Sequence, residues 1–120
     1  MLISLHSLVA VNPFNIAAVY CGIDRVELKM SNGFSHNLDC RDNPSDTYAK
    51  FMKRLRAKAD FYSVDEKRSV NPEHVISAAT NNKGIYIAIT GGTMIYIPIE
   101  RRDHREPELA RIVKELEAFA

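Results

Sequence analysis

The residues best suited to bind an anion form one short run near the end of the chain, Glu100-Arg101-Arg102-Asp103-His104-Arg105. Arginine guanidinium groups donate paired hydrogen bonds to phosphate oxygens, and the run precedes an expected helix, whose N-terminus favours negative charge. Tyrosines on the preceding hairpin would add an aromatic surface for a base or a ribose. We therefore expect one site for an anionic, nucleotide-type ligand, made by Arg101, Arg102, His104, Arg105, Tyr86 and Tyr96. The alternative is a solvated loop, as most charge runs are.

A second group of cations lies on one face of an expected helix over residues 47–58. The group consists of Lys50, Lys53, Arg54, Arg56 and Lys58. Such a face is either solvated or follows the phosphate backbone of a nucleic acid, in which case binding weakens steeply with salt. The sequence leaves both interpretations open.

The chain lacks the motifs of common catalytic sites. It contains no G-x-S-x-G, no H-E-x-x-H and no Walker-type phosphate loop. Cys40 and His36 could share one face of a strand, but zinc usually takes about four ligands, and the sequence offers no second close pair. Cys21 and Cys40 fit reduced core thiols better than a disulfide, although their redox state stays open. We expect no enzyme activity, no metal and no cofactor.

Composition places the chain among ordinary globular domains. Its 120 residues suffice for one domain with a single core or for two intimate lobes, and 46% are hydrophobic and 26% charged. The net charge of +1 gives no global attraction to nucleic acid. No apolar run is long enough to span a bilayer, and the start of the chain alternates like a strand, so we expect a cytoplasmic protein without membrane contact.

The elements that would position these residues belong to an internal sequence repeat. A shift of 59 residues without a gap aligns Asn12-Pro13 with Asn71-Pro72 and Gly33 with Gly92. After the last strand the shift becomes 61, which aligns the apolar residues of two expected helices. These pairs are Tyr48 with Leu109, Phe51 with Ile112, Met52 with Val113 and Leu55 with Leu116. We therefore predict one domain, residues 1–120, made of repeat one (1–59) and repeat two (60–120).

Each repeat has the same succession of local signals. A short hairpin ends at Asn-Pro, where proline stops the strand, and three further strands follow around Gly-containing turns. In repeat one, the strands over 25–30 and 34–39 alternate apolar and polar residues. An amphipathic helix closes each repeat, over 47–58 in the first and beginning near Pro107 in the second. The predicted class is α+β, with two similar antiparallel units of about five short strands, each followed by a C-terminal helix.

The repeats differ on the outward face of their sheets. Where the first repeat has Glu27, Lys29, Ser35, Asn37 and Asp39, the second has Tyr86, Ala88, Met94, Tyr96 and Pro98. An apolar face of this size needs a cover, which could be a helix of the same chain, a second copy in a homo-oligomer, or a bound ligand.

The Asn-Pro-x-x-Ile string, the Gly-centred hairpin and the closing helix resemble the small FlbD-like family, β-rich proteins of flagellar operons and phages. The resemblance rests on Asn12, Pro13 and Gly33 and their copies, and it implies a fold and a small regulatory or nucleic-acid-binding module.

The size, the duplicated hairpins and the terminal helix are also similar to phage counter-defence "sponge" proteins of the Thoeris anti-defence type. That similarity implies a viral oligomer in the host cytoplasm that sequesters a cyclic nucleotide or an ADP-ribose-like signal without cleaving it. This is our leading expectation, and the FlbD-like module is the alternative.

Overall fold

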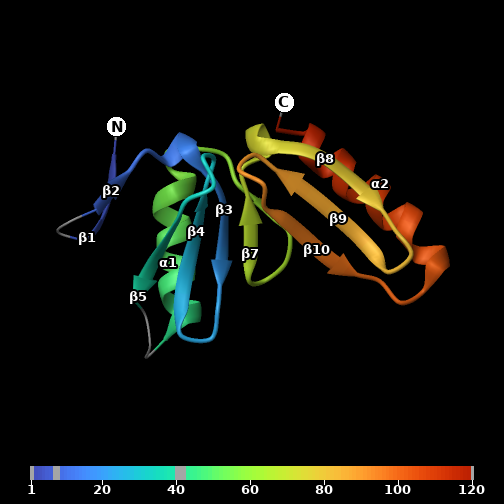
Figure 1. Ribbon diagram of the computed structural model, residues 1–120, viewed down its shortest axis with the longest axis horizontal. Coiled ribbons are helices and arrows are strands. Elements are labelled where there is room, and N and C mark those ends of the chain that lie inside the picture. The colour runs from blue at the N-terminus through green and yellow to red at the C-terminus, as the bar shows by residue number, and fades with distance from the viewer. Residues whose placement is uncertain (1, 7–8, 40–42, 120) are drawn as a thin grey trace.

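A computed structural model describes residues 2–6, 9–39 and 43–119 as an α+β molecule with antiparallel sheets and two α-helices. The sheets follow one another along the long axis of an elongated body of 48 × 31 × 23 Å (Figure 1). They contain two, five and three strands, within the described part of the chain. No described helix is long and apolar enough to cross a membrane.

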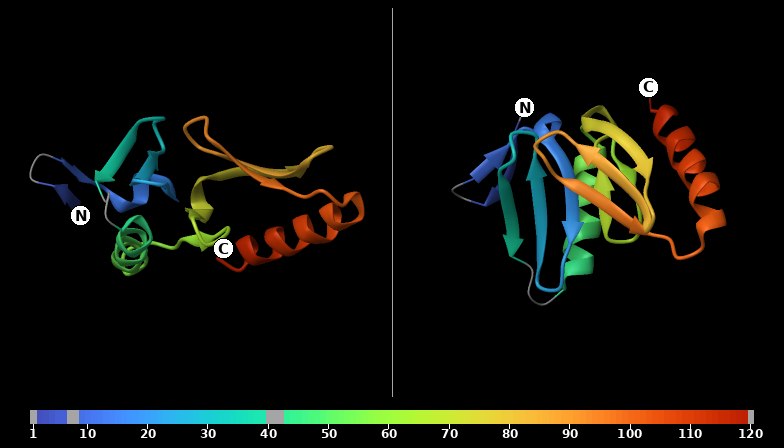
Figure 2. Two further views of the ribbon diagram at one scale, coloured as in Figure 1. Left: turned by 90° about the horizontal axis from the view of Figure 1, so that it is seen from below. Right: turned by 45° about the vertical axis from the view of Figure 1, so that its right-hand side comes forward.

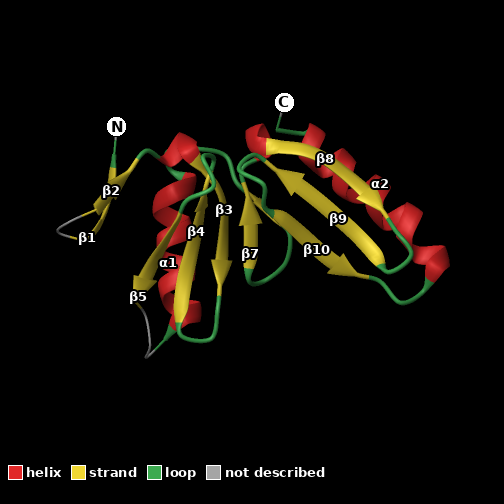
Figure 3. Cartoon of the chain, viewed as in Figure 1, coloured by secondary structure: helices red, strands yellow, loops and turns green. Residues whose placement is uncertain are grey.

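The strands, the first 3-10 turn and the closing α-helix follow in the same order in both halves, and the second half has one more 3-10 turn, η3, among the described residues (Figure 3). The first half contains β1 (Ile3–His6), β2 (Val9–Val11), the 3-10 turn η1 (Pro13–Asn15), β3 (Ile16–Cys21), β4 (Arg25–Met30), β5 (Ser35–Asp39) and α1 (Pro44–Arg56). The second half contains β6 (Tyr62–Ser63), β7 (Arg68–Val70), η2 (Pro72–His74), β8 (Val75–Thr80), β9 (Gly84–Ile89), β10 (Met94–Pro98), η3 (Arg102–His104) and α2 (Arg105–Glu117).

The Asn-Pro turns have the geometry that their sequence predicts. Asn12 and Asn71 cap the two 3-10 turns with nearly equal backbone angles, φ −81° and ψ 119° against φ −81° and ψ 117°. Each side-chain oxygen accepts a hydrogen bond from a backbone N–H two residues on, at 3.1 Å from Phe14 and 3.0 Å from Glu73. The proline that follows needs no such partner because it has no N–H.

The three-stranded meanders also match in register. β3 pairs with β4 and β8 pairs with β9, and the pairing shifts at the same place, between Ile16 and Ala18 and between Val75 and Ser77. The hairpin tips of the two meanders touch each other, since a Cβ on Gly33 would lie 3.2 Å from the carbonyl oxygen of Gly91. Both glycines have positive φ, which their turns require.

The pairing of the β6–β7 hairpin differs from the prediction of two separate five-stranded units. β7 pairs with β3 of the first half, so the central sheet has the order β5-β4-β3-β7-β6 and β8–β10 form a sheet of three strands. The side chains of Tyr62 and Val70 nevertheless pack with Ile85 and Ile87 of the second half. The hairpin therefore joins the halves, because its backbone completes one sheet while its side chains complete the other core.

Each helix covers one sheet, and both lie on the same side of the molecule (Figure 2). α1 begins after Asn43, whose side chain accepts from the N–H of Asp46 at 3.0 Å, and it buries the stripe predicted from its spacing, Tyr48, Phe51, Met52 and Leu55. Of the stripe predicted for α2, only Ile112 is fully buried, while Leu109, Val113 and Leu116 are half-buried. α2 thus closes its core less completely than α1 does.

Candidate functional site

The predicted arginine run begins two residues after the end of β10, contains the turn η3 and ends at the first residue of α2. Arg102 and Arg105 line a hollow of about 690 Å³ together with the turn between β8 and β9. Asp103 and Glu106 line the same hollow, so its two cations are matched by two carboxylates. Arg105 also donates to the carbonyl oxygen of Ile99 at 3.1 Å, which fixes the guanidinium against the backbone.

The other predicted members of this site are only partly brought together. Tyr86 and Tyr96 are cross-strand neighbours and half-buried, and neither lines the hollow. The Tyr96 hydroxyl donates to Asn81 at 3.2 Å, and Asn81 does line it, which places Tyr96 at the margin. Arg101 and His104 are exposed and are not among the lining residues, and Arg101 lies 3.5 Å from Asp103.

The apolar outward face of the β8–β10 sheet is partly covered. Tyr86, Ala88 and Tyr96 are half-buried, whereas Met94 is 57% exposed. Arg68 of β7 reaches the carbonyl oxygen of Tyr96 at 2.7 Å, which ties β10 to the joining hairpin. The tyrosines therefore do not stand bare in water, and part of the cover comes from the same chain.

The basic face of α1 is the other candidate, and its buried stripe fixes its direction. Lys50, Lys53, Arg54 and Arg56 are exposed on α1 and Lys58 is exposed just after it. Lys50 pairs with Asp46 at 2.9 Å, and Arg56 donates to Ser63 at 2.7 Å. Among the described residues, Lys53 and Arg54 have neither an ion-pair nor a hydrogen-bond partner on their side chains.

The matching face of α2 is mixed in charge, because Arg111 and Lys114 stand where α1 has Lys50 and Lys53. At the shift of 61, Glu115 and Glu117 stand where α1 has Arg54 and Arg56. Arg111 forms ion pairs with Glu108 and with Glu115, the latter at 2.7 Å, and the hydrogen bond from Arg111 lowers the pKa of Glu108. Folding the same kind of helix onto the same kind of sheet therefore does not require cations at the positions of Arg54 and Arg56.

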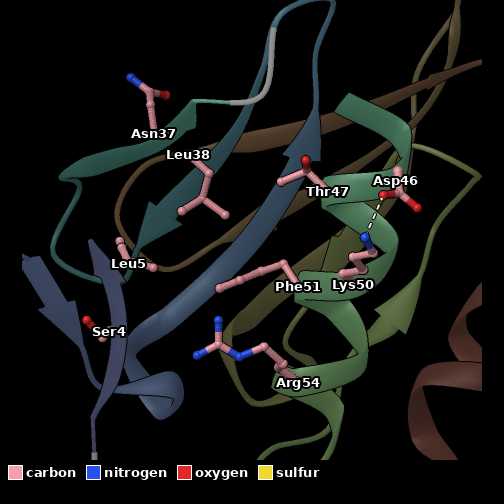
Figure 4. Close-up of a pocket in the computed structure, with 9 residues that line it drawn as sticks. All are labelled: Ser4, Leu5, Asn37, Leu38, Asp46, Thr47, Lys50, Phe51 and Arg54. Atoms are coloured by element: carbon pink, nitrogen blue, oxygen red, sulfur yellow. Dashed lines mark ion pairs between the residues drawn. The ribbon is translucent and has the colours of Figure 1, made fainter. Parts of the chain in front are cut away.

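A hollow of about 670 Å³ lies beside this face, between α1, β1 and β5 (Figure 4). Lys50 and Arg54 border it, with the ring of Phe51 and the amide of Asn37 among the other lining groups. The sequence did not reveal this hollow, because its lining comes from three separate segments. The only signal in the sequence was the basic helix itself.

The described residues hold no group of three or more His, Cys, Asp or Glu side chains placed to bind a metal ion. Cys21 is half-buried and unpaired within the described part. Cys40 lies outside the described residues, so the question of a disulfide stays where the sequence left it.

Comparison with known proteins gives a fold likeness without a family. No protein-family model and no curated protein matched the sequence. Among solved structures, the chain is similar to the LytTr DNA-binding domain of a protein described as a methyl-accepting/DNA response regulator from Bacillus cereus. The TM-score is 0.61 at 9% sequence identity, over 96% of this chain and 94% of that domain. The likeness supports a small β-rich module with this fold, and it is specific to neither an FlbD-like nor a sponge protein.

Proposed function

We propose that this chain is a small regulatory module that binds nucleic acid without converting it chemically, and that the exposed face of α1 contacts the phosphate backbone. The observation that carries the proposal is a pair of exposed cations, Lys53 and Arg54, whose side chains have no partner among the described residues. In α2, Lys114 stands at the position of Lys53 and Glu115 at the position of Arg54. Lysine and arginine on such a face displace counterions from phosphates, which drives association. The fold likeness to a DNA-binding domain supports the same class of partner.

The charge distribution predicts what kind of binding this would be. The whole chain has a net charge of only +1, so attraction comes from the local face of α1 and not from the molecule as a whole. A few phosphate contacts give an affinity that falls steeply with salt, with a logarithmic slope of about −0.9 per contact on duplex DNA. We expect slopes of roughly −2 to −4 for a face of this size.

The test compares two charge reversals at matching helix positions. Lys53→Glu lies on the basic face of α1, and Lys114→Glu lies at the corresponding exposed position of α2. Fluorescence anisotropy with a labelled duplex should give about tenfold weaker binding for Lys53→Glu, with the salt slope reduced by about one. Lys114→Glu should bind like the unaltered chain. Equal effects of the two variants, or no binding at low salt, would reject the proposal.

A small anionic ligand is the second candidate, supported by the hollow that Arg102 and Arg105 line. In this version the chain is the phage counter-defence sponge expected from the sequence, holding a cyclic nucleotide or an ADP-ribose-like signal in the cytoplasm. Asp103 and Glu106 weaken it, because they would face the same phosphates. Titration calorimetry with cyclic ADP-ribose and cyclic nucleotides decides: heat that Arg102→Ala abolishes and Arg101→Ala preserves supports this site, and no heat rules it out.

We also infer that residues 1–59 and 60–120 descend from one duplicated unit. The shared order of strands and α-helices, the nearly equal angles at Asn12 and Asn71 and the matching register shifts support this inference. An experimental structure would test it by superposition. Halves that differ in strand order or in the place of the bulge would contradict a common origin.

A further inference from the structure

The hairpin β6–β7 contacts both halves of the chain. Its side chains pack in the core of the second half, while the outer edge of β7 pairs with β3 of the first half. The ladder is bounded by two backbone hydrogen bonds, from Asn71 N–H to Ala17 at 2.8 Å and from Cys21 N–H to Lys67 at 2.7 Å. One half of the chain therefore donates a hairpin to the sheet of the half before it.

The matching elements at the two ends of the chain lack this pairing. At the shift of 59, β2 corresponds to β7 and β8 corresponds to β3. Within the described residues, β2 pairs with β1 alone and β8 pairs with β9 alone. β2 and β8 lie in the sheets at opposite ends of the elongated body (Figure 1). We call the pairing of β7 with β3 the filled junction. The free edges of β2 and β8 correspond to its two sides, and we call them the unfilled sides of a second junction.

Exposed apolar side chains mark both unfilled sides. Leu2 is 64% exposed, whereas Phe61, its counterpart beside the filled junction, is 4% exposed. Ile76 of β8 is 68% exposed, whereas its counterpart Ala17 in β3 is fully buried. Solvating two large aliphatic side chains is unfavourable, and an open sheet edge is a template for pairing with another chain.

We propose that β2 of one copy pairs antiparallel with β8 of a second copy, and that this junction repeats the one inside the chain. The internal pairs Val70 with Ala18 and Ser69 with Val19 fix the register. Their counterparts place Val11 opposite Ser77, and Ala10 opposite Ala78. The joined strands β10-β9-β8-β2-β1 form a five-stranded sheet with the same order of strand types as the central sheet.

The side chains at the proposed junction suit each other. In the internal junction the Tyr48 hydroxyl of α1 hydrogen-bonds Ser69 at 2.7 Å, and both residues are buried. The counterparts are Leu109 of α2 and Ala10 of β2, so a polar pair is replaced by an apolar pair. Neither copy leaves an unpartnered polar side chain at this position, which burial would make costly.

The junction joins two different surfaces, so it is heterologous. Head-to-tail contacts of this kind generate closed rings when the rotation between copies closes, and filaments when it does not. The partner is therefore a second copy of this chain, joined by strand addition at a sheet edge. This assembly is independent of whether α1 binds nucleic acid.

Two proline substitutions test the junction from its two sides. Ala10→Pro and Ala78→Pro remove the N–H groups that the register turns toward the open edges, and proline is tolerated on an edge strand whose N–H faces solvent. Ile76→Lys is a second variant on the β8 side that keeps every backbone donor. Ile23→Lys is the control, since Ile23 is 97% exposed in the turn between β3 and β4, on neither edge.

Light scattering during size-exclusion chromatography gives the readout. The unaltered chain and Ile23→Lys should have masses of several copies, and Ala10→Pro, Ala78→Pro and Ile76→Lys alone should each have the mass of one chain, 13.6 kDa. An equal mixture of Ala10→Pro and Ala78→Pro should form a dimer of one copy of each, because one intact edge of each kind remains. An unaltered chain that stays monomeric at every concentration overturns the proposal, as do edge variants that assemble normally or a mixture that forms no heterodimer.

Discussion

Two tyrosine hydroxyls tie the joining hairpin β6–β7 to the two helices. Tyr48 of α1 bonds Ser69, and Tyr62 donates to Glu115 of α2 at 2.9 Å. The Tyr62 ring also meets Phe119 edge to face, with centroids 6.3 Å apart. Burial raises the pKa of both phenols, and for Tyr62, with the bond to Glu115 as a further cause, the pKa reaches about 12. Each helix is thereby tied to the segment that joins the halves.

Tyr62 gives a pH dependence with a definite sign. The fold favours the neutral phenol, so its contribution to stability is complete below the ordinary pKa of 10.0 and is lost as the pH rises from there toward about 12. We expect the free energy of unfolding, measured with urea, to fall more steeply above pH 10 for the unaltered chain than for Tyr62→Phe. Parallel curves for the two proteins would show that Tyr62 does not titrate in this way.

At the scale of elements, the tips of the two meander hairpins lie backbone against backbone. A Cβ on Gly91 would lie 2.8 Å from the carbonyl oxygen of Met30, whereas one on Gly92 would meet nothing within 4 Å. Both glycines have positive φ, so both substitutions carry the same kind of backbone strain. Comparing Gly91→Ala with Gly92→Ala therefore separates the effect of the contact between the tips from the effect of backbone strain.

We expect Gly92→Ala to lower the free energy of unfolding by about 1 kcal/mol and Gly91→Ala by roughly twice that or more. Thermal and urea unfolding of the two variants measure the difference. If Gly92→Ala proved the more harmful, the two tips would not pack against each other as the structure has them.

The sequence predicted most of the individual elements. Asn-Pro marked the end of each hairpin, and the glycines marked the meander turns. It did not predict that β7 would pair with β3, because the alternation of β7 is the same whichever sheet receives its edge. The choice depends on packing: Ala17 and Ala18 are fully buried against the joining hairpin, and no local pattern reports that.

The candidate sites were predicted to different degrees for a similar reason. Both groups of cations, on α1 and within residues 101–105, can be identified from the sequence. Whether each is neutralised depends on neighbours: Lys53 and Arg54 have no side-chain partner among the described residues, while Asp103 and Glu106 share the hollow of Arg102 and Arg105. Of the two candidate binding surfaces, the structure therefore favours the one that the sequence had left as an alternative.

At the scale of the whole molecule, two features are not needed for the fold: the open sheet edges at β2 and β8, and the exposed cations of α1. Head-to-tail pairing would repeat α1 at regular intervals along a ring or filament. Several weak basic faces on one assembly bind a long polyanion far more tightly than one face does, since later contacts form at a high effective concentration. Edge variants that are monomeric should therefore bind a long duplex more weakly than the unaltered chain, while binding a short duplex equally well.

Hydrogen exchange followed by mass spectrometry, with and without duplex DNA at low salt, tests whether α1 contacts nucleic acid. We expect slower exchange in peptides that cover residues 47–58 and unchanged exchange in peptides that cover residues 105–117. Protection confined to residues 100–105, or saturated binding with no protection of α1, would contradict it.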